Sequence, residues 1–140
     1  MNKMKHAMMG AHARDYVIIM GSLTLGGSGA ISSTTGFAPS AAAAVSPGVV
    51  KTATKTGRYT VTLDRSYKEI ILLNADLVGP TDAAFGNTNA NAVGFRNRTA
   101  GTGNAAPASF DIQLMLASTG ADTDGASGTE VHWAVAVRAY

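Results

Sequence analysis

Apolar and polar residues alternate in several stretches of the chain, and each such stretch predicts a strand with one face in a core and the other in water. In 59–63 large apolar side chains alternate with threonine. Residues 109–117 carry Phe, Ile or Leu at every second position, and 131–137 do the same with Val and Trp. We predict strands over these three ranges, the last two paired as a hairpin.

The densest apolar run lies within 69–78, where Ile70 to Leu73 are four consecutive large apolar residues. A short apolar run with a turn at each end is typical of a strand that is covered on both faces. We therefore expect this strand at the centre of a sheet. The turn at Asp64–Ser66 predicts that it forms a hairpin with 59–63.

Weaker patterns add further strands. The β-branched run at Tyr16–Met20 continues past Gly21 to Leu25, which predicts a first strand that bends at the glycine. Val49–Val50 and, within the long segment 80–108, Val93–Arg96 are two more candidates. The sequence thus predicts an all-β fold, a jelly-roll-like antiparallel β-sandwich of about eight strands. The expected core consists of Tyr59, Val61, Leu63, Ile70, Leu72, Phe110, Ile112, Leu114, Val131, Trp133 and Val135.

A length of 140 residues corresponds to one domain, which we place at 14–140 behind a flexible N-terminal arm at 1–13. The arm carries cations among methionines, and thioether side chains supply adaptable apolar contact while cations meet carboxylates. It is therefore our candidate partner-binding element. The candidate partner-binding residues are Lys3, Lys5, His6, Met8, Met9 and His12 of the arm, with Arg14 directly after it. The rival contact is the base of the sandwich near 64–68.

Charged residues make up 14% of the chain, against about 25% in typical soluble domains. So little solvating surface, together with the apolar run at 70–73, predicts a closed homo-oligomer, with a trimer as the first choice. The formal net charge of +2 argues against nucleic acid as a partner. No stretch of the sequence reaches the length of a membrane span, and there is no cysteine for a disulfide.

The residue types that carry chemistry occur without the patterns that chemistry requires. Gly26–Gly29 has no following lysine, so we interpret it as a turn rather than a phosphate loop. Asp122 and Asp124 with Glu130 lack the spacing of a calcium loop, and a solvated turn is the preferred interpretation. His132 has no serine in a strained elbow as a partner. We expect no enzyme activity, no cofactor and no metal; a hydrolase that uses His132 is a distant third hypothesis.

The succession of 57–63, 70–79, 110–116 and 130–137, with an Asp/Gly/Ala-rich turn before the last strand, resembles small β-sandwich structural proteins of tailed bacteriophages. The resemblance covers 49–140. It implies a head decoration (cement) protein, usually a trimer, that stabilises the capsid from outside. The implied partner is the major capsid protein, and the implied location is the capsid exterior of a virion made in the host cytoplasm.

A second hypothesis is a tail-fibre or adhesion module that binds glycans through the amide-rich loop 87–104, where Asn89 and Asn91 would be contact residues. The two hypotheses predict different ligands, a protein shell or a sugar.

Overall fold

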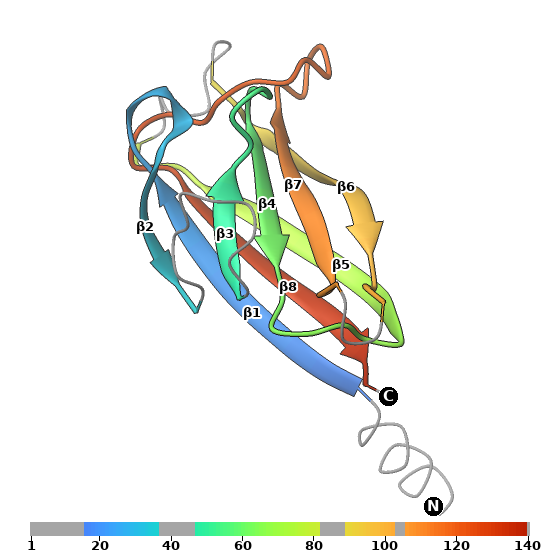
Figure 1. Ribbon diagram of the computed structural model, residues 1–140. Helices are drawn as coiled ribbons and strands as arrows, with labels where there is room; N and C mark the ends of the chain where they lie inside the picture. The colour runs from blue at the N-terminus through green and yellow to red at the C-terminus, as the bar shows by residue number, and fades with distance from the viewer. Residues whose placement is uncertain (1–15, 37–46, 82–88, 103–105, 140) are drawn as a thin grey trace, which may run out of the picture.

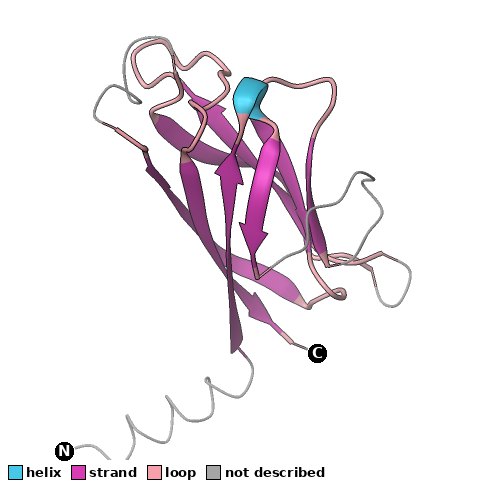
Figure 2. Cartoon of the chain, turned by 90° about the vertical axis from the view of Figure 1, so that its left-hand side faces the viewer, coloured by secondary structure: helices cyan, strands magenta, loops and turns pink. Residues whose placement is uncertain are grey.

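The computed structural model describes residues 16–36, 47–81, 89–102 and 106–139. Strands dominate this part of the chain, and Figure 2 shows them joined by loops, with the short 3-10 turn η1 (Gly27–Gly29) at one end. The strands are β1 (Tyr16–Leu25), β2 (Ile31–Thr35), β3 (Gly48–Lys51), β4 (Arg58–Thr62), β5 (Glu69–Val78), β6 (Ala92–Thr99), β7 (Ser109–Met115) and β8 (Glu130–Arg138).

The strands form two four-stranded antiparallel sheets. Sheet A has the order β2-β1-β8-β5 and sheet B the order β3-β4-β7-β6. In Figure 1 the strands of the two layers cross obliquely, and the start of β1 lies beside the end of β8. The predicted all-β sandwich of about eight strands is confirmed. Three pairs of consecutive strands form local hairpins: β1–β2 in sheet A, and β3–β4 and β6–β7 in sheet B.

Both predicted long hairpins are wrong. β4 lies in sheet B and β5 in sheet A, so the segment 63–68 crosses between the layers instead of turning back. The segment 116–129 likewise carries the chain from β7 in sheet B to β8 in sheet A. Alternation of apolar residues shows that a strand has a buried face, but two strands of equal period pack across a sandwich as well as they pair within a sheet.

The core fills the space between the sheets. All predicted core residues are buried except Leu72, and Leu23, Leu25, Val49, Tyr67, Ala90, Ala108 and Val137 join them. Edge-to-face ring contacts run through this core from Phe95 to Phe110 and on to Trp133, with centroid distances of 5.9 and 5.5 Å. Such contacts add to the stabilisation from area burial.

The prediction of a central strand at 69–78 is wrong. β5 is the edge strand of sheet A, and its burial alternates along most of its length. Ile70 pairs with Val137 and Leu72 with Ala136, so Ile71 is an extra, bulged residue. The apolar run therefore combines two inward residues with two outward ones, Ile71 and Leu72, and its density does not reflect burial on both faces.

The first strand continues through Gly21 to Leu25 as predicted. β1 stays in register with β8 on both sides of the glycine, which faces Trp133. A Cβ atom on Gly21 would lie 2.4 Å from Cζ2 of that ring, so the glycine makes room for the indole. Val93–Arg96 is confirmed as a strand within β6, and Gly26–Gly29 is confirmed as a turn that includes η1.

Candidate functional site

The outer face of sheet A, which points away from the core, is apolar across three strands. Ile18 of β1 pairs with Ala136 of β8, which pairs on its other side with Leu72 of β5. Met20 pairs with Ala134 in the next outward row. We call Ile18, Met20, Leu72, Ala134 and Ala136 the outer apolar patch. Ile18, Met20 and Leu72 are 70%, 69% and 60% exposed.

The outer apolar patch has a raised rim and a low centre. Its large side chains stand on β1 and β5, while the central strand β8 contributes two alanines. A partner can therefore seat an apolar ridge along β8 between the flanking side chains. Contiguous apolar surface enclosed by polar residues is a common feature of interaction sites, which makes this patch the candidate site.

Polar rows close the patch at both ends. At one end Arg138 Nη2 donates a hydrogen bond to the Tyr16 hydroxyl at 3.0 Å, and Arg138 Nη1 lies 3.3 Å from Glu69 Oε1. The guanidinium also lies 5.4 Å from the centre of the Tyr16 ring. At the other end His132 Nε2 and Glu130 Oε2 are 2.8 Å apart. The exposed apolar surface is thus a bounded area with a charged margin.

The outer face of sheet B is built in the opposite way. Asp111 accepts hydrogen bonds from Thr60 Oγ1 at 2.7 Å and from Asn97 Nδ2 at 2.6 Å. Gln113 accepts one from Arg58 Nε at 2.8 Å and donates to the carbonyl of Thr56 at 3.0 Å. Asp111 and Gln113 are buried beneath this network. The buried polar groups of this face are therefore satisfied within the sheet.

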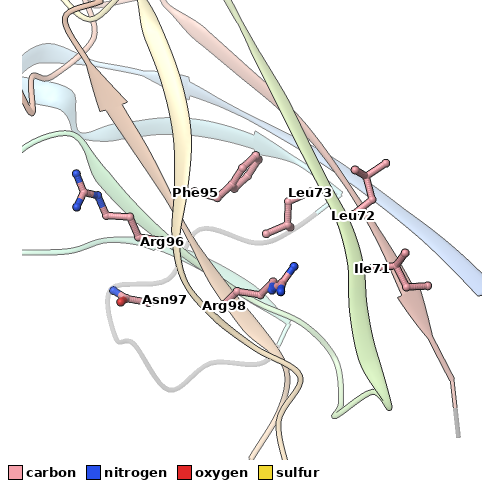
Figure 3. Close-up of a pocket in the computed structure, with 7 residues that line it drawn as sticks. All are labelled: Ile71, Leu72, Leu73, Phe95, Arg96, Asn97 and Arg98. Atoms are coloured by element: carbon pink, nitrogen blue, oxygen red, sulfur yellow. The ribbon is translucent and has the colours of Figure 1, made fainter. Parts of the chain in front are cut away.

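A groove separates β5 from β6, at the open side of the sandwich where both sheets end. We call it the bulge groove; it has a volume of about 430 Å³ and is lined by Ile71, Leu72, Leu73, Phe95, Arg96, Asn97 and Arg98. Figure 3 shows Leu73, Phe95 and Arg98 pointing into the space between the two strands. Ile71 and Leu72 point to the far side of β5, and Arg96 points away from it.

His132 lies on the outer face of sheet A, and its cross-strand neighbours are Ser22 and Asp76. Sequence reasoning missed Ser22 as a neighbour because the two residues are 110 positions apart and register alone brings them together. The imidazole is tied to Glu130, and both side chains are 48% exposed. A half-solvated pair on an open sheet lacks the dry, preorganised surroundings that activate a nucleophile.

The two aspartates of the last loop have structural contacts. Asp124 Oδ1 accepts a hydrogen bond from the Gly57 N–H at 2.8 Å and forms an ion pair with Lys51 Nζ at 3.1 Å. Asp122 pairs with Arg96 at 3.4 Å. Both carboxylates lie in a loop and are partly solvated, at 30% and 37% exposure for Asp124 and Asp122, and these contacts also tie the loop to the sandwich. Within the described ranges no cluster of three or more His, Asp or Glu side chains is arranged to hold a metal ion.

Tyr59 joins the same corner of the sandwich from inside. Its hydroxyl donates a hydrogen bond to the Gly29 carbonyl at 2.6 Å, so it fixes η1 to β4. Burial, followed by the nearby Asp124 carboxylate, raises the pKa of the Tyr59 phenol above its ordinary value. The hydrogen bonds of Tyr59 and Asp124 thus hold together the η1 turn, the β3–β4 turn and the loop before β8.

The residues predicted to bind a partner, Lys3, Lys5, His6, Met8, Met9, His12 and Arg14, lie outside the described residues. The amide-rich segment is described in part, and most of that part is β6. Asn91 Oδ1 accepts a hydrogen bond from the Ala117 N–H at 2.7 Å, and Asn97 donates to Asp111. These two amides therefore serve the fold.

No protein-family model, curated protein or solved structure matches the chain. Among the described residues no helix has the length and apolar character to span a membrane.

Proposed function

We propose that this protein is a structural virion component that acts by contact, a decoration protein of a tailed-phage head. The observation that carries the proposal is the outer apolar patch, because Ile18, Met20 and Leu72 are largely exposed and lie side by side across hydrogen-bonded strands. Apolar surface of this extent gains free energy when a partner covers it. The resemblance to phage decoration proteins supplies the class of partner.

The two outer faces support a contact role better than a catalytic one. Sheet B is closed by its own hydrogen bonds, whereas sheet A presents a bounded apolar area on rigid strands. A rigid surface loses little conformational entropy when it docks. The proposed partner is the major capsid protein, reached from the capsid exterior, and the proposed working form is a homotrimer.

Co-sedimentation with capsid shells tests the proposal. Shells assembled from the major capsid protein of the same virus are mixed with the full-length chain over a range of concentrations. We expect saturable binding to assembled shells and none to free coat subunits, since a decoration protein fits the lattice rather than one subunit. Absence of binding to shells at micromolar concentration would refute the proposal.

The glycan-binding hypothesis receives no support from the described part of its loop. Asn91 Oδ1 and Asn97 Nδ2 are engaged within the fold, so only part of each amide is left for a sugar. A glycan array probed with the intact chain tests this alternative directly. Reproducible binding that is lost in an Asn89→Ala, Asn91→Ala variant would favour an adhesion module over a decoration protein.

A further inference from the structure

The bulge groove lies between two irregularities that face each other. In β5 the register with β8 shifts at Ile71. In β6 the register with β7 shifts between Arg96 and Thr99, and Asn97 has a positive φ of 50°. The side chain of Asn97 holds this conformation through its 2.6 Å hydrogen bond to Asp111. Bulges at sheet edges re-aim side chains, and here the second bulge turns Arg98 toward β5 (Figure 3).

The side chains in the groove have two complementary characters. Leu73 and Phe95 form an apolar floor that continues into the core. Arg98 is exposed above it, and no carboxylate of the described residues lies within ion-pair distance of its guanidinium. The neighbouring Arg96, by contrast, is paired with Asp122. The groove therefore offers an apolar seat beside one available cation.

We propose that the bulge groove binds an extended segment of a partner protein, with an apolar side chain on Leu73 and Phe95 and a carboxylate on Arg98. β5 and β6 are the last strands of their sheets, so an extended chain can run along the seam between them. The positive charge of Arg98 selects an acidic segment, because a guanidinium binds a carboxylate in a bidentate way. The inference does not depend on the proposed decoration function.

The required segment has a simple pattern. Residues two apart on an extended chain point to the same side, so the apolar residue and the acid must be separated by one residue. The probe is a capped peptide with a central leucine–threonine–glutamate sequence between serine and threonine residues. A matched peptide with lysine in place of the glutamate is the charge control. Binding is followed by chemical-shift changes in amide NMR spectra of the full-length protein.

We expect the acidic peptide to shift the amide signals of Leu73, Phe95 and Arg98 in a saturable way, and the lysine peptide to bind on the order of tenfold more weakly. Arg98→Glu should weaken binding of the acidic peptide by a similar factor and improve binding of the lysine peptide. Lys55→Glu is the matched control, because the substitution makes the same change of charge at an exposed residue. Lys55 lies in the β3–β4 turn, at the opposite end of sheet B from Arg98. This control should leave both affinities unchanged. Arg98→Gln, which removes charge without reversing it, should give an intermediate loss.

Three results would overturn the inference. The first is equal binding of the acidic peptide by the wild type and Arg98→Glu. The second is a set of shifted signals that maps to the outer face of sheet A instead of the groove. The third is a concentration-dependent dimer that Arg98→Glu dissociates, because the occupant would then be a second copy of this chain.

Discussion

Replacing the three large side chains of the outer apolar patch with threonine tests whether this surface carries the shell contact. Full burial of an Ile, Met or Leu side chain is worth about 1.5–3 kcal/mol. Ile18, Met20 and Leu72 expose 70%, 69% and 60% of their area. Covering what is exposed therefore contributes about 1–2 kcal/mol for each residue, and at least about 3 kcal/mol for all three.

The triple variant Ile18→Thr, Met20→Thr, Leu72→Thr should bind shells at least about a hundredfold more weakly than the wild type, because about 1.4 kcal/mol corresponds to a factor of ten. Its folding stability should change little, since the side chains are exposed and threonine is a good strand former. Co-sedimentation gives the affinity, and a thermal melt followed by circular dichroism gives the stability.

Val78→Thr is the matched control for that experiment. Val78 is apolar, 46% exposed and at the far end of β5, where it pairs with Glu130 outside the patch. It should bind shells like the wild type. If the triple variant is folded and also binds like the wild type, the outer apolar patch is not the contact surface, and the reasoning from exposed apolar area fails.

Three further predictions concern stability and the N-terminal arm. Gly21→Ala should destabilise the fold by about 1–3 kcal/mol, because its Cβ would overlap the Trp133 ring. The control Gly27→Ala, which has open space around the new methyl group, should melt within a degree or two of the wild type. Equal melting temperatures of the two variants would show that the Trp133 ring does not restrict position 21. Because the pKa of Tyr59 is raised in the folded state, folding favours the protonated phenol. The stabilisation that this phenol contributes to the folded state is complete below about pH 10 and is lost as the pH rises further. The urea midpoint should therefore fall less between pH 9 and pH 11 in Tyr59→Phe than in the wild type, and an equal fall would exclude Tyr59 as the cause. Deleting 1–13 should leave a folded oligomer that no longer decorates shells; unchanged affinity of the truncated chain would exclude the arm as a contact.

The sequence predicted the strands much better than it predicted their neighbours. Alternation at 109–117 and 131–137 correctly located β7 and β8 and their buried faces. It could not show that β7 pairs with β4 and β6 while β8 pairs with β1 and β5, because register and partner depend on contacts between residues far apart in the chain.

The candidate site was missed for a related reason. Consecutive apolar residues at 70–73 suggested burial on both sides, and the bulge that sends Leu72 outward leaves no mark in the sequence. In β1 the unbroken run Tyr16–Met20 contains Ile18 and Met20, both exposed. The available signal was the apolar character of both faces of β1 and β5, since an outward apolar face is a common feature of interaction surfaces.

β5 serves both proposed contacts, and Leu72 lies at the border between them, since it belongs to the outer apolar patch and also lines the bulge groove. Leu72 faces outward into the outer apolar patch, whereas its neighbour Leu73 faces the bulge groove (Figure 3). The double variant Ile18→Thr, Met20→Thr, which leaves every residue of the groove in place, should therefore weaken shell binding and keep its affinity for the acidic peptide. Arg98→Glu should do the reverse, because Arg98 stands on β6 of the other sheet. If one variant abolished both activities while remaining folded, the two surfaces would form a single site, and the assignment of separate partners to them would be wrong.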